Sequence, residues 1–429
     1  MKKIVIILIG ALLLNSCSLY KTFETPEINS ENLYRDTILE SNVAVNDSVN
    51  LGNIPWRELF TDPKLQSLIE QGLESNIDLQ TALLRIEQAE ASVSSARLAY
   101  LPDLSLSATG TLTSLDGADV ESYSVPVSSS WQIPLFGGVR NSKKGAIATL
   151  EQSKAYKQAV QTQLISIIAS NYYSLLMLDR QLEITDKTIL NWCKRTETMK
   201  ALKSVGMTNE ASITQSEASY YSLKTSRIDL QRSIRELENA LSITLGKAPQ
   251  SIDRGVWKNI ELPATISAGV PIQMLANRPD IKQYEMALAN AFYNTNVARS
   301  AFYPNITISA SGGWSNGTGF ALSPDDFILG AVGSLAAPIF NKGLNKANLK
   351  IAKADQEVAL LNFNQNILIA SNEVSDALFQ FTSALEKQNN RDKQLESLEK
   401  SVAYKNELFQ LASSTYLEVL TAEQDLLSA

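Results

Sequence analysis

Two long stretches of this chain carry apolar side chains at helical spacing and contain no helix-breaking residue. Residues 146–205 include neither proline nor glycine, the two residues that most often interrupt a helix. Apolar residues recur there three or four positions apart, as at Val160, Leu164 and Ile168. The stretch from residue 344 to Ala429 also lacks proline and glycine. The pattern predicts long helices, since the 60 residues of the first stretch would extend roughly 90 Å as one helix.

Shorter helices are predicted beside these two. Asp62 and Pro63 supply an N-cap and a first-turn proline, and the helical period then continues with a break at residues 76–78. Gly206 provides a residue that can adopt the left-handed conformation at a helix end. We therefore predict a turn near Gly206 and a return helix over residues 210–245.

Between the helices the period changes from helical to two. Leu104, Leu106 and the next even positions are small or apolar, while the odd positions are serine and threonine. Strands of ten to thirteen residues with one apolar and one polar face suit a transmembrane β-barrel, and equally a soluble hairpin on a globular sheet. The predicted strands are residues 103–113, 122–135, 304–314 and 327–338, with loops at 114–121 and 315–326.

The chain contains an internal duplication. Pro102 and Pro304, which precede the first strand of each pair, are 202 residues apart, and Pro134 and Pro338, near the ends of the second strands, are 204 apart. One repeat of this size indicates a duplication rather than a solenoid, and the aromatic residues at the strand ends favour the membrane barrel over the soluble hairpin. The predicted first repeat covers 62–270 and ends in an irregular linker at 246–270, and the second repeat covers 271–429, with a turn near 414.

The N-terminus has the pattern of a targeting segment. Lys2 and Lys3 precede an apolar run of the length found in signal peptides, which is too short to span a bilayer comfortably. It ends in Leu-Asn-Ser-Cys at residues 14–17, which resembles a bacterial lipobox, in which the signal is cut before a cysteine that then receives lipid. We predict a signal peptide at 1–16, lipidation of Cys17, and a tether with an irregular segment over 17–61. The alternative is an ordinary secretory signal followed by a chance cysteine.

Composition narrows the classes of function. The formal net charge is −7, so nothing suggests a nucleic-acid partner. The chain has no histidine, which removes the commonest general base and the commonest metal ligand. We therefore expect neither an enzyme nor a bound cofactor or metal.

Four motifs carry a resemblance to a known family. They are Leu-Ala-Asn-Arg-Pro-Asp-Ile at 275–281, Phe-Tyr-Pro at 302–304, Pro-Ile-Phe at 338–340 followed by Gly343, and Tyr-Leu-Glu-Val-Leu-Thr-Ala-Glu at 416–423. Together with the duplication and the lipobox, they make the chain similar to the bacterial outer-membrane efflux channels, the TolC/OprM-like outer-membrane factor lipoproteins. The resemblance covers nearly the whole chain after the signal peptide.

The resemblance implies the architecture and the partners. It implies a mainly α-helical chain with membrane β-strands, in which three protomers each give four strands to one shared transmembrane β-barrel and their long antiparallel helices to a periplasmic α-barrel. An equatorial belt would include residues 246–270 and parts of 17–61. Such a homotrimer, inserted in outer-membrane lipid, would be a passive exit duct for small toxic compounds or drugs, docked on a periplasmic adaptor and an inner-membrane pump. Four strands cannot close a barrel alone, which agrees with an oligomer.

Two sites follow from this resemblance. The first is the adaptor-contacting tip, formed by two helix turns that contain Val205, Gly206, Met207, Ser413, Ser414 and Thr415. The second is the periplasmic aperture. The family often has an acidic residue at the position of Thr421, and Glu418 lies about one helical turn earlier. We predict that Glu418 forms a ring of carboxylates in a trimer. The alternative is that Glu418 faces a helix or solvent, and that packing around Tyr416 and Leu417 closes the mouth.

Other functions fit parts of the pattern. Relatives also serve as outlets of type I protein or peptide secretion systems, and the sequence does not separate that function from drug efflux. A structural periplasmic lipoprotein with coiled-coil rods is a hypothesis of another class, and it would conduct no ions. The predicted last helix is also much shorter than its counterpart over 210–245, and the sequence does not tell whether the end at Ala429 is a truncation.

Overall fold

The computed structural model forms two compact units, which are described one at a time. Unit 1 comprises residues 1–29, 81–159 and 275–369, and unit 2 comprises residues 30–80, 160–274 and 370–429. Each unit contains segments from both predicted repeats. The two units therefore do not correspond to the two repeats, and the repeat boundary at residue 270 stays a prediction. The structure describes residues 20–27, 55–115, 118–206, 208–256, 277–316, 324–411 and 413–429.

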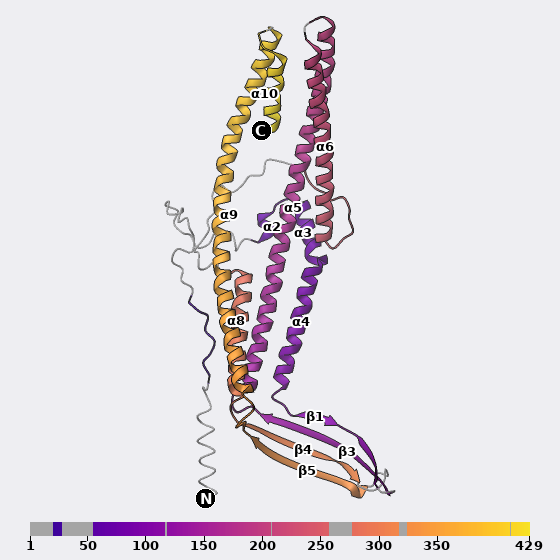
Figure 1. Ribbon diagram of the computed structural model, residues 1–429, viewed down its shortest axis with the longest axis vertical. Coiled ribbons are helices and arrows are strands. Elements are labelled where there is room, and N and C mark those ends of the chain that lie inside the picture. The colour runs from indigo at the N-terminus through magenta and orange to yellow at the C-terminus, as the bar shows by residue number, and fades with distance from the viewer. Residues whose placement is uncertain are drawn as a thin grey trace. The chain divides into compact units, whose positions relative to one another are not determined.

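Two helices of equal length confirm the long helices that the apolar spacing predicted. Helix α5 runs over Gly138–Ser204 and α9 over Leu344–Gln410, each with 67 residues (Figure 1). Helix α5 begins before residue 146, where the stretch without proline and glycine starts, because the helix tolerates Gly145 in its first turns. Gly145 is buried, and its carbonyl oxygen accepts a hydrogen bond of 3.0 Å from the side chain of Asn290.

The shorter helices follow their capping residues. Asp62 caps helix α3 (Pro63–Ser75), because its side chain accepts a hydrogen bond of 2.9 Å from the backbone N–H of Lys64. Asn76 produces the predicted break, because its side-chain oxygen accepts from Leu79 N–H at 3.0 Å and so caps the next helix. Residue 271, where the predicted second repeat begins, lies outside the described residues. These helices are α2 (Trp56–Leu59), α3 (Pro63–Ser75), α4 (Ile77–Leu98), α6 (Glu210–Thr244), α8 (Pro279–Ser300) and α10 (Tyr416–Ser428).

Unit 1 contains one antiparallel sheet. Its strands are β1 (Asp103–Leu106), β2 (Thr109–Leu115), β3 (Ala118–Ile133), β4 (Asn305–Asn316) and β5 (Phe327–Ala336), with a short 3-10 helix, η3 (Pro324–Asp326), before β5. The strand order is β1-β3-β4-β5, and β2 also pairs with β3. The pairing of β3 with β4 joins the two predicted hairpins into one sheet.

The prediction of a single strand over 103–113 is wrong, since the structure divides it into β1 and β2. Leu106 pairs with Val127 and Thr109 pairs with Ser124, so the register is the same on both sides of the break. The break lies opposite Pro126, which has no N–H to donate to the ladder. The other strands end within a few residues of their predicted bounds.

Pro126 also explains a glycine on the other side of β3. Gly313 of β4 pairs with Pro126, and a Cβ atom at position 313 would lie 2.3 Å from the Val125 carbonyl oxygen. Only glycine allows the two strands to approach this closely.

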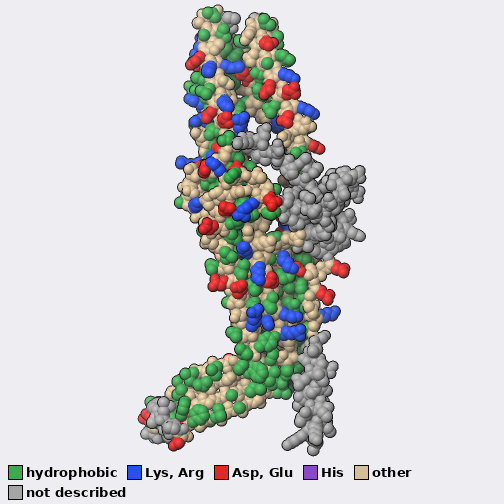
Figure 2. Space-filling model, turned by 180° about the vertical axis from the view of Figure 1, so that it is seen from behind, with side chains coloured by type: hydrophobic (Ala, Val, Ile, Leu, Met, Phe, Trp, Pro, Cys, Tyr) green, Lys and Arg blue, Asp and Glu red, His purple; other side chains and the backbone are tan. Residues whose placement is uncertain are grey.

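Apolar side chains on this sheet are exposed rather than covered by a core. Leu104, Leu106 and Leu112 are exposed by 76%, 70% and 64%, and Figure 2 shows hydrophobic side chains spread over the sheet. Exposed apolar surface of this extent marks a contact with lipid or protein. Within the described ranges, no helix is both long enough and apolar enough to cross a membrane.

The helices of unit 2 pack around two apolar clusters. The larger joins α3, α5 and α6 and includes Leu65, Ile69, Ile168, Tyr172 and Leu241, all completely buried. The smaller joins α5, α6 and α10 through Trp192, Met199, Ile213, Tyr416 and Leu420. Each fully buried side chain of this size contributes roughly 1.5–3 kcal/mol, so these clusters hold the helices together.

Candidate functional site

The first predicted tip turn connects α5 to α6 in unit 2. Gly206 has a φ of +78°, the left-handed conformation that the sequence predicted for it. A Cβ atom there would meet nothing within 4 Å, and the neighbouring Val205 is 68% exposed. An ion pair between Lys203 and Glu210 links the two helices across the turn. Met207 lies outside the described residues.

The second predicted tip turn connects α9 to α10. Ser413 closes it by donating its backbone N–H to the carbonyl oxygen of Leu408 at 2.8 Å. The hydroxyl groups of Ser414 and Thr415 donate to the carboxylate of Glu418 at 3.1 and 3.3 Å. These polar groups at the start of α10 are therefore occupied in organising the turn itself.

Glu418, the predicted aperture carboxylate, has a cation beside it. Lys405 of α9 forms an ion pair with Glu418 of α10, and this pair, followed by the Ser414 hydroxyl, holds the pKa of Glu418 below its ordinary value. The contact favours the alternative in which Glu418 faces a neighbouring helix. The carboxylate ring in a trimer stays a prediction.

The other two predicted aperture residues differ in exposure. Tyr416 is buried in the smaller apolar cluster, and its ring lies 5.6 Å from that of Phe409. Thr421 is exposed, and its hydroxyl donates to the Leu417 carbonyl oxygen of its own helix at 3.0 Å. Tyr416 therefore packs against other residues of the same chain. The Thr421 side chain instead lies on the surface of its helix.

Sequence reasoning missed a partly buried ion pair that joins two helix hairpins. Arg195 of α5 pairs with Glu423 of α10, whose side chain is only 13% exposed. Burial raises the pKa of the Glu423 carboxyl, and the positive charge of Arg195 partly opposes this rise. Next to the pair, Gln424 donates to the Ser219 hydroxyl of α6 at 3.2 Å. No local pattern in the sequence pointed to these partners.

A second missed cluster fastens residues 252–255 to the helices of unit 2. Arg254 donates to Asp179 of α5 at 2.5 and 2.9 Å and to Glu238 of α6 at 2.5 Å. The Tyr172 hydroxyl donates to Asp62 at 2.5 Å and accepts from the Gly255 N–H at 3.0 Å. These bonds hold the start of the predicted linker against α3, α5 and α6.

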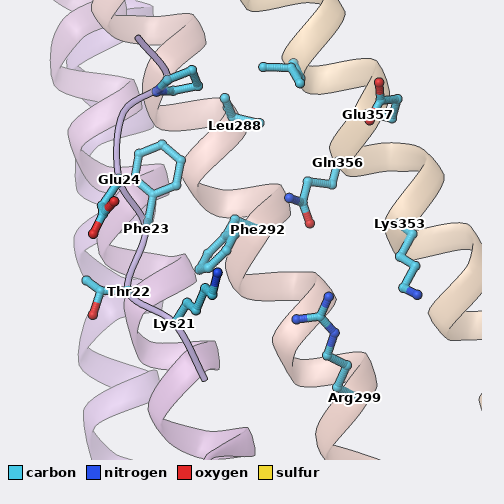
Figure 3. Close-up of a pocket in the computed structure, with 12 residues that line it drawn as sticks. Lys21, Thr22, Phe23, Glu24, Leu288, Phe292, Arg299, Lys353, Gln356 and Glu357 are labelled. Atoms are coloured by element: carbon cyan, nitrogen blue, oxygen red, sulfur yellow. The ribbon is translucent and has the colours of Figure 1, made fainter. Parts of the chain in front are cut away.

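In unit 1, residues 20–27 form an extended strap along α8. The Tyr20 hydroxyl donates to the Phe136 carbonyl oxygen at 3.1 Å, and the Phe23 ring meets the Phe292 ring edge-on at 5.8 Å. The strap, α8 and α9 line a cleft, to which Lys21, Arg299 and Lys353 each contribute a cation from a different segment (Figure 3). Cys17, the predicted lipidation site, lies outside the described residues.

The comparisons with known proteins agree with this geometry. A family model described as outer membrane efflux protein matches residues 68–247 and 270–429. The cation efflux system protein CusC of Escherichia coli (strain K12) is 28% identical over 425 residues, which covers 97% of this chain and 92% of CusC. The toluene efflux pump outer membrane protein TtgC of Pseudomonas putida is 26% identical over 453 residues, covering 100% of this chain and 90% of TtgC.

The fold is also that of a known channel. A crystal structure of CusC matches this chain with a TM-score of 0.83 and 26% identity, over 96% of this chain and 94% of that one. The predicted fold class, with long helices beside membrane strands, is therefore confirmed, as is the predicted place in the outer membrane. Because the family model covers most of the residues, the chain belongs to the outer membrane efflux protein family and is an efflux protein rather than an enzyme.

Proposed function

We propose that this chain is the passive, trimeric exit duct of a tripartite efflux system. Three copies would complete one barrel from their sheets, and the helix turns at Val205–Gly206 and Ser413–Thr415 would dock on a periplasmic adaptor that connects to an inner-membrane pump. The observation that carries the proposal is the combination of family membership with a sheet whose apolar side chains are exposed. The exported compounds would be small and toxic to the cell.

Export from intact cells tests the duct. A strain that lacks the gene should accumulate the exported dye or drug, and the wild-type gene should restore its export. Gly206→Pro should abolish restoration while trimers still form, since proline fixes φ near −65° and Gly206 has a φ of +78°. Full restoration by this variant would contradict docking through the turn.

Crosslinking tests the adaptor contact directly. A cysteine replacing Val205 should form a crosslink with the adaptor, whereas one replacing Leu98 of unit 1 should not, although their exposures are close at 68% and 60%. Equal crosslinking from both positions would mean that the contact is unspecific. If only a protein-exporting adaptor were captured, the chain would serve secretion instead. The spacer hypothesis predicts no conductance in planar bilayers, whereas the duct predicts open channels.

Lipidation of Cys17 is part of this proposal. Metabolic labelling with a fatty-acid analogue should mark the wild-type protein and not Cys17→Ser. Cys193→Ser is the matched control, since Cys193 is a half-buried free thiol within α5 and its loss should leave the label intact. Equal labelling of Cys17→Ser and wild type would disprove lipidation.

A further inference from the structure

Charges of unit 1 are separated by sign at the junction between helices and sheet. Asp and Glu outnumber Lys and Arg over the whole chain, 45 to 38, yet four stretches beside the strands contain nine Lys or Arg and no Asp or Glu. The stretches are 91–102, 134–150, 286–304 and 337–354. We call the nine cations the basic collar: Arg97, Arg140, Lys143, Lys144, Arg299, Lys342, Lys346, Lys350 and Lys353.

The sheet itself has the opposite bias. From residue 104 to 139 and from 305 to 341 there is no Lys or Arg, and the charged residues are Asp116, Asp119, Glu121, Asp325 and Asp326. All of them lie around the connections between β2 and β3 and between β4 and β5. The connections at one end of the sheet therefore carry only negative side chains. The helix end carries the collar and a single carboxylate, Asp103 at the start of β1, which accepts a hydrogen bond of 2.6 Å from the Ser130 N–H.

The described residues give the collar no carboxylate partner, and Arg299 donates only to the amide oxygen of Asn296, at 3.0 Å. Lys143 and Lys144 instead lie over the rings of Tyr100 and Tyr293, 5.7 and 5.5 Å from the ring centroids. Clustered cations without carboxylates repel one another, so an external anion would relieve the repulsion.

The cleft beside the strap places three cations on the sheet side of two carboxylates. Lys21 precedes Glu24 in the strap, where Tyr20 binds the strand-end turn. Lys353 likewise lies one turn nearer than Glu357 to the strand end of α9, and Arg299 is in the last turn of α8. In Figure 3 Arg299 lies between Lys21 on the strap side and Lys353 on the α9 side, across the lower part of the cleft, and Glu24 and Glu357 lie above them in the view.

The surroundings of the collar identify the class of anion. Exposed aromatic and apolar residues adjoin it, with Ile339 exposed by 99% and Phe340 by 85%. Apolar surface next to a row of cations fits the boundary between acyl chains and headgroups of a bilayer, where each Lys or Arg gains about fivefold in binding to an anionic leaflet. A soluble anion would need the cations but not the apolar rim.

We propose that the basic collar binds anionic phospholipid headgroups of the membrane leaflet next to the helices, and that the cleft of Lys21, Arg299 and Lys353 seats one headgroup phosphate. This inference rests on the proposed insertion of the sheet into the outer membrane. It adds a lipid site that fixes how deeply the sheet enters the bilayer.

Native mass spectrometry of the full-length protein in a neutral detergent tests the site, with phosphatidylglycerol and phosphatidylcholine as probes. The wild type should bind phosphatidylglycerol in preference, and the preference should fall with added salt. Lys21→Gln with Lys353→Gln should weaken phosphatidylglycerol binding by on the order of tenfold or more. Both side chains are exposed, so the fold should be unaffected.

The matched control is Lys154→Gln with Lys282→Gln, which removes two cations of unit 1 that pair with Glu151 and Glu285 on their own helices. It should keep the lipid preference. Equal binding of both lipids by the wild type, or equal loss in the control, would overturn the proposal, as would displacement of the lipid by millimolar glycerol phosphate. A failed lipid site would leave outer-membrane fractionation and export intact, whereas a failed duct would remove both.

Discussion

The two units use charge in opposite ways. In unit 1 the basic collar contains cations only, and within the described ranges none of them has a carboxylate partner. In unit 2 cations and carboxylates from different segments meet in pairs. The pairs are Arg57–Glu70, Lys64–Asp253, Arg195–Glu423, Lys200–Glu217, Lys203–Glu210, Arg227–Asp186, Arg254–Asp179, Arg254–Glu238 and Lys405–Glu418.

The difference separates two roles of surface charge. A pair between two helices is satisfied inside the chain, and it fixes which turn of one helix lies beside which turn of the other. The collar cations are not neutralised by a carboxylate of the described residues, so they stay available to an anion outside the chain. Unit 2 therefore uses these charges to align helices, whereas the collar of unit 1 presents its charges for binding. Removing charges from each unit tests this distinction.

The largest effect on stability is expected at Arg254. Its side chain is 15% exposed and serves both Asp179 and Glu238. Arg254→Met would leave two carboxylates without their cation, which costs about 3–5 kcal/mol when such pairs are buried. The midpoint of thermal unfolding, followed by circular dichroism in detergent, should fall by several degrees or more.

A matched exposed pair provides the control for Arg254. Arg232 is 67% exposed and pairs with Asp229 and Glu236 of its own helix. Arg232→Met should cost less than about 1 kcal/mol. Similar melting of the two variants would mean that the residues around 254 are not fastened to the helices as the hydrogen bonds indicate.

Local signals in the sequence predicted the elements but not these partners. Asn76 and Gly206 act on their own neighbours in the chain, and both form the break and the turn predicted from them. Arg254 and Asp179 are 75 residues apart, and no periodicity says which charges meet when helices pack. The effect of Pro126 on the opposite strand was missed for the same reason.

In the candidate site, too, the features set by neighbouring residues were predicted and the contacts between helices were not. The two helix turns near Gly206 and Ser414 were predicted where the structure has them, because helix ends carry local signals. That these turns form the adaptor-contacting tip stays a prediction. The pairing of Glu418 was not predicted, because its partner Lys405 lies on another helix, 13 residues away. The collar, by contrast, can be found from the sequence, because finding it requires only the position of each charged residue relative to the predicted strands.

The second effect concerns Arg195 and has a pH dependence. Arg195→Met would leave the partly buried Glu423 without its cation, at a cost of about 1–3 kcal/mol at pH 7. Burial raises the pKa of Glu423 and Arg195 opposes that rise, so the variant should have a still higher pKa in the folded state. The folded state then takes up a proton before the unfolded chain does, and the deficit should shrink as the pH falls from 7 toward 5.

Melting temperatures of wild type and Arg195→Met measured across this pH range give the answer. Lys200→Met is the control, since its partner Glu217 is 39% exposed, and its smaller deficit should not recover at low pH. A deficit for Arg195→Met that grows on acidification would contradict the buried position of Glu423.

A third prediction concerns channel selectivity at Glu418. If Lys405 neutralises this carboxylate, Glu418→Gln should change the cation preference of single channels only slightly. Lys405→Gln would release the negative charge and should increase the preference and the block by multivalent cations. A large loss of preference in Glu418→Gln would instead support the ring of carboxylates. Thr421→Asp, which adds a carboxylate to an exposed position, should raise the preference in either case.

The smallest effect on stability is expected in the collar. Lys346 and Lys350 lie one turn apart on α9, are exposed, and form no ion pair with the described residues. Changing both to glutamine removes two positive charges, whereas Arg254→Met removes one. The free energy of unfolding in neutral detergent should nevertheless shift by no more than about 0.5 kcal/mol. If anything the shift should be stabilising, because two like charges four residues apart on a helix repel each other.

In bilayers that contain phosphatidylglycerol the sign should reverse, since the wild type gains headgroup contacts that the variant lacks. A marked destabilisation in detergent would show that the collar has partners within the chain, and the contrast between the two units would then disappear.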